Sequence, residues 1–465
     1  MLSEKDICFT SLINQVELII NKKISCVELN RIYLDNIKKL NPIYNCFISV
    51  DNEEVLKVAK CKDEELSNKK IDKKHLYGIP ISVKDVIKTK DLKTTYGSII
   101  YKDHVETHDS VSVERIKKNQ GIIIGKTNTP EFAFGALCEN KILGSTKNPW
   151  NLEYSSGGSS GGSAAAVSLG LSPVSLGTDF GGSVRTPAAF CGCVGLRPTP
   201  GRIPNSEKYN AWKWLSTEGI LARNIDDAFY FLNCISGTHK HDPFSLYCDW
   251  PAPKEKVKIA STLDFGQAYN VDPEIKNLWE KTIADLCEIL GEIKNIHPNI
   301  KNADESFKTL RSFNSWMNYQ DLVEKHANLL TESFIWNVKQ GEKISSKQLK
   351  TAEMYQHETY KNFMNFFDDI DILIAPSTSV LPFRNTQNNV ETINGIKTST
   401  IIDYLACTYF ISLVGFPSVS LPSKFKHREF PFGIQLIAKP FNELALQKIA
   451  KILENKGYCY LQPGI

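Results

Sequence analysis

The sequence lacks the features that mark membrane proteins, nucleic-acid-binding proteins and secreted proteins. Its 55 Lys and Arg nearly balance 52 Asp and Glu, so the net charge is only +3 and no strong field favours nucleic acid or an anionic membrane. No apolar run is long enough to cross a bilayer, and the N-terminus has no small-residue cleavage site after an apolar run. We therefore expect neither a nucleic-acid nor a membrane partner.

A disulfide framework is not expected either, although the chain has 12 cysteines. They are scattered from Cys8 to Cys459 without the density of a small secreted domain, which favours a reduced, cytoplasmic compartment. The close pair Cys191 and Cys193 has no second pair or histidine nearby, so two buried small side chains are expected there rather than a metal site.

The first third of the chain predicts helices followed by buried strands. Ser25 and Glu28 form a capping box, and apolar residues then recur at helical spacing until Asn41-Pro42, where the helix is expected to end. Thr129-Pro130-Glu131 predicts the start of another helix. Short apolar runs bounded by glycine predict buried strands; they are LYGIPISVKD (76–85), QGIIIGKTN (120–128) and SPVSLGTD (172–179).

The later part continues the alternation of helices and strands, which favours an α/β sheet covered on both faces. The middle is charged and helix-rich. Further strands are predicted at 371–379, 417–423 and 431–439, and a closing amphipathic helix at 444–453. The polar segment 237–257 is typical of a connection between the two parts. Its His239, His241 and Asp242 are expected to be solvated rather than to bind a metal.

Residues 155–187 are unusually rich in glycine and serine. A flexible linker is excluded because the apolar helix 164–171 lies inside the run. A phosphate-binding loop is disfavoured because no lysine followed by Ser or Thr closes it. Residues 157–161 match the G-x-S-x-G nucleophile elbow, which would make Ser159 the nucleophile, but no later histidine stands in an evident catalytic setting.

A fourth interpretation uses GGSSGGSAAAVSLGLSPVSLGTDFGGSVRTPAAFCG together with motifs elsewhere in the chain. This stretch resembles the signature of the amidase signature family, whose enzymes use a Ser-Ser-Lys triad. Further matches are GIPISVKDV, TTYGS, GKTNTPEFAFG, KNPWN, GLRPTPGR, DILIAPST and GFPSVSLP. The resemblance implies an α/β/α sandwich with a large mixed sheet. We expect one amidase domain over 1–465, with a signature core at about 76–205, a variable middle at about 270–365 and C-terminal strands and helix at about 370–465.

The resemblance implies that Ser183 is the nucleophile, that Ser159 is the bridging serine after a cis peptide bond, and that Lys84 is the base. A serine hydroxyl needs a base to attack an amide, and a lysine can act only when burial keeps it neutral. Taken alone, Lys84 would be interpreted as a surface lysine, Ser159 as a turn serine and Ser183 as a helix N-cap.

The glycines beside Ser183 predict an oxyanion hole, in which successive backbone N–H groups turn toward one point. Its members are Phe180, Gly181, Gly182 and Ser183. Asp179 and Arg185 match the acidic and basic positions of the signature, and we interpret them as a structural pair that holds the loop. Nothing in the sequence calls for a metal or an organic cofactor.

The expected function is therefore hydrolysis of a small-molecule carboxamide to a carboxylate plus ammonia or an amine. One alternative is the A subunit of a tRNA-dependent amidotransferase, and another is an inactive family member that only binds; a homodimer is left open. Several aromatic residues are candidates to line an apolar pocket or to belong to the core: Phe134, Trp316, Tyr319 and Trp336.

Two departures from the amidotransferase subunits favour a free hydrolase. Residues 311–326 contain nothing like the F-D-G-V-R-Y-G stretch typical of those subunits. Where they tend to carry an Asp three residues before a Thr, this chain has Leu405 before Thr408, although Asp403 is close enough to take the place of that acid. An apolar side chain cannot pair with an α-ammonium group, so glutamine is expected to bind poorly.

Overall fold

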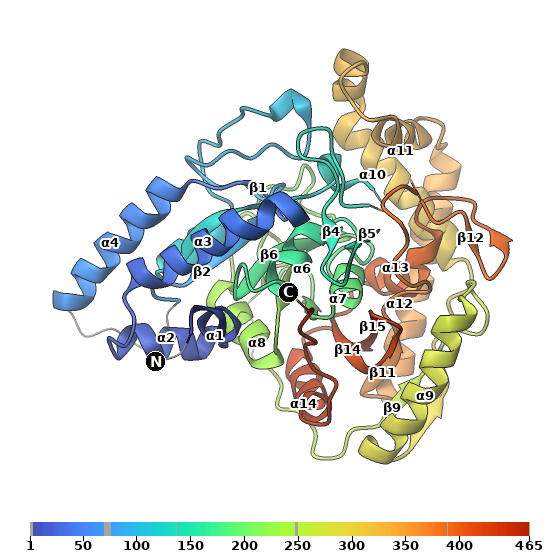
Figure 1. The fold of residues 1–465 in the computed structure, drawn as a ribbon. Helices are drawn as coiled ribbons and strands as arrows, with labels where there is room; N and C mark the ends of the chain where they lie inside the picture. Colours follow the sequence, from blue (N-terminus) through green and yellow to red (C-terminus); the bar gives the residue numbers. More distant parts are fainter. Residues whose placement is uncertain (1–2, 69–75, 136, 247–249, 388, 465) are drawn as a thin grey trace.

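Eleven strands form one mixed sheet through the molecule (Figure 1). The protein is described by a computed structural model that covers residues 3–68, 76–135, 137–246, 250–387 and 389–464. The strands of this sheet are β1 (Phe47–Ser49), β2 (Pro80–Lys84), β3 (Ile122–Thr127), β6 (Val174–Asp179), β7 (Val194–Arg197), β8 (Thr217–Ala222), β9 (Ile259–Ser261), β10 (Ile293–Asn295), β11 (Ile372–Pro376), β14 (Ser418–His427) and β15 (Phe430–Ile437). Two separate hairpins pair β4 (Lys147–Asn148) with β5 (Asn151–Ser155) and β12 (Thr392–Ile393) with β13 (Ile396–Lys397).

The strand order is β1-β3-β2-β6-β8-β7-β14-β15-β11-β9-β10. β2 lies parallel to both β3 and β6, and β9 lies parallel to both β10 and β11, whereas β6, β8, β7, β14, β15 and β11 follow one another antiparallel. The two parallel groups are thus joined through an antiparallel centre. The β2 and β11 strands are buried along their whole length, as the continuous apolar runs of the sequence predict.

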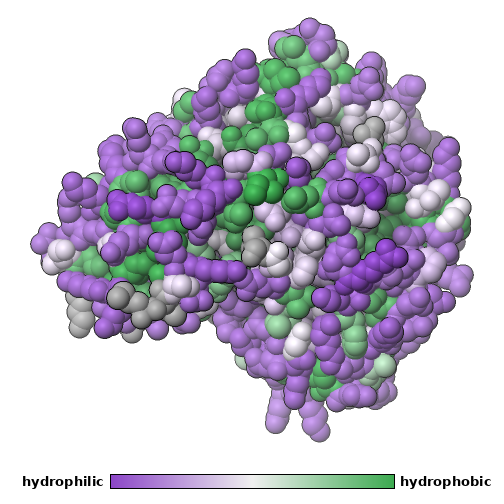
Figure 2. All heavy atoms as spheres, in the orientation of Figure 1, coloured by the Kyte–Doolittle hydropathy of each residue, from purple (hydrophilic) through white to green (hydrophobic). Residues whose placement is uncertain are grey.

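Helices cover the sheet and complete the predicted α/β/α class. They are α1 (Glu4–Phe9), α2 (Leu12–Ile20), α3 (Cys26–Tyr44), α4 (Asn52–Asn68), α5 (Val111–Lys118), α6 (Gly161–Ser168), α7 (Arg185–Cys191), α8 (Ile225–Ile235), α9 (Pro273–Leu290), α10 (Ala303–His326), α11 (Glu332–Glu342), α12 (Ser346–Asp369), α13 (Ala406–Val414) and α14 (Glu443–Glu454). In the described ranges, no helix is both long enough and apolar enough to span a bilayer. Figure 2 shows hydrophilic residues over most of the viewed face, with groups of hydrophobic residues between them.

The strands predicted from apolar runs are confirmed. The three early runs contain β2, β3 and β6, the first late run contains β11, and the other two late runs overlap β14 and β15, of which β14 extends four residues further than predicted. The predicted closing helix is α14, and the helix-rich middle consists of α9 to α12. The segment predicted as a connection follows α8 and precedes β9, and its residues 247–249 lie outside the described residues.

The first predicted helix is confirmed at its start and corrected at its end. Ser25 caps α3 through a reciprocal capping box with Glu28. The helix does not end at Asn41-Pro42 but continues through Pro42 to Tyr44, where Asn45 adopts a left-handed conformation. A proline costs most in a helix interior; here only the last turn follows it, and the Asn45 N–H still donates to the Asn41 carbonyl at 2.8 Å.

The helix predicted at Thr129-Pro130-Glu131 is wrong. Only a short 3-10 turn, Glu131–Ala133, forms there, and Phe132 has a left-handed φ of 48°. The Glu131 carboxylate accepts hydrogen bonds from Ser98 Oγ at 2.6 Å and from the Thr331 backbone N–H at 2.7 Å. These tertiary contacts bind the segment to two other parts of the chain, and they outweigh the local preference for a helix.

The glycine- and serine-rich run is buried along most of its length, so it is part of the core and not a linker. Its glycines allow backbone to approach backbone. A Cβ on Gly162 would lie 2.5 Å from the Asn128 nitrogen, and one on Gly157, whose φ is 80°, would lie 2.9 Å from Pro187 Cα. The predicted burial of Cys191 and Cys193 is also confirmed.

Candidate active site

Lys84 ends strand β2 and has no solvent-exposed surface. Its Nζ donates to Ser159 Oγ at 2.7 Å and to Thr178 Oγ1 at 2.8 Å. The fold therefore brings together a lysine and a serine that lie 75 positions apart in the sequence. The surface interpretation of Lys84 is excluded, and Thr178, to which the sequence assigned no role, is its second partner.

Burial controls the charge of Lys84. Desolvation lowers its pKa from 10.5 to about 7, because an ammonium group loses its hydration inside the protein, and the negative charge of Asp179 opposes that shift only in part. A sizeable fraction of Lys84 is therefore uncharged at neutral pH. That is the state in which an amine can accept a proton.

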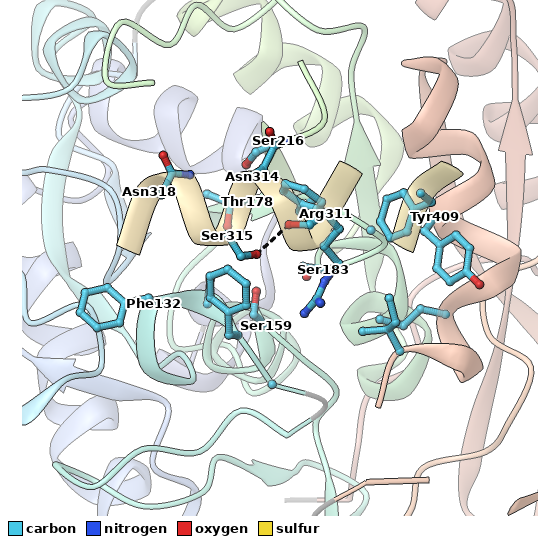
Figure 3. Close-up of a pocket in the computed structure, with 18 of the residues that line it drawn as sticks. Phe132, Ser159, Thr178, Ser183, Ser216, Arg311, Asn314, Ser315, Asn318 and Tyr409 are labelled. Atoms are coloured by element: carbon cyan, nitrogen blue, oxygen red, sulfur yellow. Dashed lines mark hydrogen bonds between the residues drawn. The ribbon is translucent and has the colours of Figure 1, made fainter. Parts of the chain in front are cut away.

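The two serines line one cavity (Figure 3). Ser159 follows a cis Gly158–Ser159 peptide bond, as the family resemblance implies, and is 2% exposed. Ser183 follows strand β6 and is half-buried. The Ser160 N–H donates to the Ser183 carbonyl at 3.1 Å, which holds the two serine-containing segments against each other. Within the described part of the chain, the Ser183 hydroxyl makes no hydrogen bond.

The predicted N-cap role of Ser183 is wrong, because Val184 occupies the cap position of α7 and its own side chain makes no capping hydrogen bond. The Asp179 carboxylate takes over this task. It accepts hydrogen bonds from the backbone N–H groups of Gly182 at 2.8 Å and Val184 at 3.1 Å. The Ser183 hydroxyl is consequently not needed to cap the helix.

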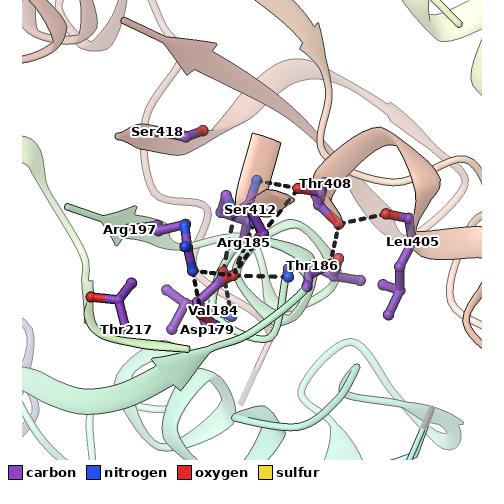
Figure 4. A network of polar contacts seen from close by, with 12 residues as sticks. Asp179, Val184, Arg185, Thr186, Arg197, Thr217, Leu405, Thr408, Ser412 and Ser418 are labelled. Atoms are coloured by element: carbon purple, nitrogen blue, oxygen red, sulfur yellow. Dashed lines mark hydrogen bonds and ion pairs between the residues drawn. The ribbon is translucent and has the colours of Figure 1, made fainter. Parts of the chain in front are cut away.

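Asp179 is also paired with two buried arginines (Figure 4). Arg185 donates to its two carboxylate oxygens at 2.9 and 3.1 Å, and Arg197 lies 3.3 Å from Oδ1. Burial by itself would raise the pKa of Asp179, but the two guanidinium groups outweigh it and hold that pKa far below its usual range. The predicted Asp179–Arg185 pair thus has a third member. Arg197 ends the buried strand β7. A charged residue at the end of a buried strand was the sequence signal that could have identified Arg197 as a member of this cluster.

The predicted oxyanion hole needs one correction. Gly182 is not among the residues that line the cavity, and its N–H is bound to Asp179. Its φ is 122°, and a Cβ there would lie 2.1 Å from Thr408 Oγ1, so this glycine allows the chain to turn. Phe180, Gly181 and Ser183 do line the cavity. The backbone N–H groups of these three make no hydrogen bond within the residues the structure describes, so they are available to a ligand.

The cavity has a volume of about 210 Å³ and mostly apolar walls. Residues from several separate parts of the chain surround it: Phe132, Ala133, Phe134, Gly135, Ser159, Thr178, Phe180, Gly181, Ser183, Ser216, Phe307, Arg311, Asn314, Ser315, Asn318, Tyr319, Ile402, Leu405 and Tyr409. Of the four aromatic candidates, Phe134 and Tyr319 belong to the lining. Trp316 and Trp336 do not, and Trp336 is 43% exposed.

One face of α10 supplies several of the polar residues of the cavity wall. Arg311, Asn314, Ser315 and Asn318 follow the i, i+3, i+4, i+7 spacing that places side chains on one face of a helix. Sequence reasoning missed all four because this part of the chain carries no family motif. The signal that could have found them is the recurrence of polar residues at helical spacing within a segment that also contains several aromatic residues.

The structure also places the two candidates for the glutamine-binding acid. Leu405 lines the cavity, whereas Asp403 does not. The Asp403 carboxylate accepts the Ser399 backbone N–H at 2.6 Å and forms an ion pair with Lys308 at 3.0 Å. Thr408 donates to the Gly181 carbonyl at 2.7 Å and so supports the loop before Ser183. Asp403 is therefore bound elsewhere and does not replace the missing acid.

A mixed sheet between helical layers, with two serines lining one cavity and a buried lysine hydrogen-bonded to one of them, defines a protein of the amidase-signature class. The model of the family described as Amidase matches residues 28–446. This chain therefore belongs to the amidase family, and the resemblance found in its motifs is confirmed.

The individual relatives include a transferase subunit, an acylamidase and a hydrolase. The chain is 33% identical over 463 residues to the A subunit of a glutamyl-tRNA(Gln) amidotransferase of Coxiella burnetii, covering 92% of this chain and 93% of that protein. It is similar to a solved bacterial aryl acylamidase of the amidase signature family, at 26% identity and a TM-score of 0.89, with 97% of each chain covered. A solved 6-aminohexanoate cyclic dimer hydrolase matches at 25% identity and a TM-score of 0.83, again with 97% of each chain covered.

Proposed function

We propose that this protein is an amidase that hydrolyses a carboxamide through an acyl-enzyme on Ser183. The Ser183 oxygen attacks the amide carbon, and its proton passes through Ser159 to Lys84. The C–N bond then breaks, and the nitrogen leaves as ammonia or an amine after taking a proton back from the relay. Water, deprotonated along the same path, attacks the ester and releases the carboxylate. This scheme uses no metal and no cofactor.

One observation carries this proposal: the fully buried Lys84 donates to Ser159, and Ser159 lines the same cavity as Ser183. Burial lowers the pKa of Lys84 to about 7, so at neutral pH part of the amine is uncharged and can accept a proton. The hydrogen bond from Ser183 to Ser159 that the relay requires is absent, and we propose that rotation of the Ser183 side chain forms it when substrate binds. Catalytic hydrogen bonds often tighten only with substrate present.

The N–H groups of Gly181 and Ser183, with that of Phe180, support charge stabilisation at the attacked carbonyl. Removing one donor of an oxyanion hole typically costs about 10²–10³ in kcat. The Asp179–Arg185–Arg197 cluster supports this arrangement because it holds the loop from both of its ends. We assign Asp179 and Arg185 to this positioning task and not to proton transfer.

The A subunit of an amidotransferase is the second candidate, and the Coxiella burnetii relative favours it. Against it, the cavity wall contains no acidic residue within the described part of the chain, and Leu405, which the motif spacing matches to the acid of those subunits, lines the cavity with an apolar side chain. An amidase acting on free small molecules is therefore the better fit. The aryl acylamidase and the 6-aminohexanoate cyclic dimer hydrolase, one an amidase and the other a hydrolase by name, have the same fold.

Ammonia and amine release from a broad amide panel tests the proposal. The isolated protein should hydrolyse at least one apolar or aromatic amide faster than glutamine, and Ser183→Ala should abolish that activity. A fluorophosphonate should label Ser183, as peptide mapping would show; label on Ser159 alone would instead support the nucleophile-elbow alternative. A protein that is inert on the panel, yet releases ammonia from glutamine once a B-type partner of an amidotransferase is added, would belong to an amidotransferase.

We also propose that residues 1–465 act as a single domain in the cytoplasm. Strands from residue 47 to residue 437 share one sheet, which supports one cooperative unit. None of the eleven cysteines in the described residues forms a disulfide with another, which supports a reducing compartment. Unfolding in two separate calorimetric transitions would contradict the single domain.

A further inference from the structure

Arg311 is a cation inside the candidate active site that the proposed reaction does not use. Its side chain lies on α10 at the cavity that Ser159 and Ser183 line (Figure 3). Across the described residues, the Arg311 guanidinium makes no hydrogen bond and no ion pair. Its central carbon lies 5.4 Å from the centre of the Phe134 ring.

Other inward-facing arginines of this protein are bound to partners. Arg185 and Arg197 share the Asp179 carboxylate, and Arg223 donates to the backbone carbonyls of Ser172 at 3.0 Å and Cys8 at 2.8 Å. Arg311 is half-buried, and desolvation lowers its pKa to about 10, which still leaves it charged at neutral pH. A charge withdrawn from water is costly to a folded protein unless an anion compensates it.

A second polar group stands beside Arg311 on the same face of α10. Asn314 is only 6% exposed and lines the same cavity. Its Oδ1 atom is buried and has no hydrogen-bond partner within the described chain. A buried acceptor of this kind costs free energy until it is satisfied. Two neighbouring residues of the cavity wall therefore lack partners of opposite kinds: Arg311 needs an acceptor, which a carboxylate would supply, and Asn314 Oδ1 needs an N–H or O–H donor from another part of the ligand.

We propose that Arg311 binds a carboxylate of the substrate, so that this protein acts on amides that carry a carboxylate beyond an apolar segment. The planar guanidinium matches a carboxylate in a two-pronged ion pair. The aromatic and aliphatic walls of the cavity suit the apolar segment between the carboxylate and the amide. This inference rests on the proposed amidase function.

The same cavity discriminates against amino acid amides. An α-ammonium group next to the bound carboxylate would be placed near Arg311 with no acidic wall residue to pair with in the described chain, since Leu405 lines the cavity and Asp403 is bound to Lys308. Like charges in a site of low polarity repel strongly. A simple monoamide of a dicarboxylic acid fits better than glutamine.

Three five-carbon amides test this directly: glutaramate, which is the monoamide of glutaric acid; pentanamide, which lacks the carboxylate; and glutamine, which adds an ammonium group. We expect kcat/KM for glutaramate to exceed that for pentanamide by about 10- to 100-fold, the range for a charge-assisted pair. Glutamine should fall below glutaramate. Succinamate and adipamate vary the spacer, and equal rates for all three acid amides and pentanamide would overturn the proposal.

Variants of α10 connect this preference to the guanidinium. Arg311→Gln should reduce the ratio of kcat/KM for glutaramate to that for pentanamide to near one. Arg311→Lys should leave an intermediate ratio, because an ammonium group keeps the charge but cannot form the two-pronged pair of the guanidinium. Lys325→Gln removes one positive charge from an exposed position of the same helix and should keep the wild-type ratio. A ratio unchanged in Arg311→Gln would refute the assignment.

Binding without turnover separates this inference from the proposed function. Glutarate, added to the Ser183→Ala variant, should raise its Tm, since a ligand that binds only the native state stabilises it. The same addition should have no effect on the double variant that also carries Arg311→Gln. A shift without any amidase activity in the wild type would support the carboxylate site and refute the amidase. Turnover of pentanamide, with no Tm shift by glutarate and no preference for glutaramate, would support the amidase and refute the carboxylate site.

Discussion

The pH dependence of hydrolysis tests the proposed role of Lys84 most directly. Burial lowers its pKa from 10.5 to about 7, so about half of the lysine is neutral at pH 7 and roughly a tenth at pH 6. Only the neutral amine can accept the serine proton. We therefore expect kcat/KM to rise about tenfold per unit between pH 5 and pH 6.5 and to level off above about pH 8. An ordinary lysine would instead make the rate rise up to about pH 10.

The assay is ammonia release at low substrate concentration from about pH 5 to pH 9, with circular dichroism at each pH to show that the fold is intact. The Thr178→Val variant adds a directed perturbation. Thr178 accepts a hydrogen bond from Lys84 and so favours the charged amine. Its loss should move the rising limb to lower pH. A rate that is flat or falls across the neutral range while the protein stays folded would refute a neutral-lysine base.

The same shift makes a prediction about stability, with a definite sign. The folded-state pKa of Lys84 lies below its unfolded value, so between about pH 7 and 10.5 the unfolded chain binds more protons and stability rises with pH. Below about pH 7 both states are protonated, and the full cost of burying the charge is present. Lys84→Met should abolish activity yet increase the free energy of unfolding at neutral pH by up to roughly 4 kcal/mol. A large loss of stability in that variant would contradict the burial argument.

Three further changes test the surroundings of the site. Asp179→Asn leaves two buried arginines without their counter-charge and should lower the free energy of unfolding, measured by chemical denaturation, by about 3–5 kcal/mol. Asp226→Asn, in a half-exposed pair with Lys451, should lower it by under about 1 kcal/mol. Equal losses in the two variants would contradict the role given to Asp179. Gly182→Ala places a Cβ 2.1 Å from Thr408 Oγ1 and should lower Tm far more than Gly464→Ala, which meets no atom within 4 Å. Leu405→Asp introduces an acid into the cavity wall and should raise glutamine hydrolysis relative to pentanamide; no change in that ratio would argue against the position assigned to Leu405.

The sequence by itself determined the family and the elements whose signals are local. GIPISVKDV and the two glycine–serine stretches identified Lys84, Ser159 and Ser183 as candidates, because spaced motifs in a fixed order are specific. Buried strands such as β2 and β11 were predictable since continuous apolar runs have few alternatives inside a protein. The capping box of α3 was predictable because both of its partners lie within one turn.

Only the tertiary structure decided which groups meet and which charges are paired. The turn at Phe132 depends on Glu131 bonding to residues that lie 33 and 200 positions away. No local pattern could reveal that the Gly182 N–H is taken by Asp179, or that Asp403 is bound to Lys308 while Leu405 faces the cavity. The lack of a partner for the Arg311 charge was likewise not predictable from the sequence. The free-energy cost of a charge depends on the solvent and the partners that the fold leaves around it.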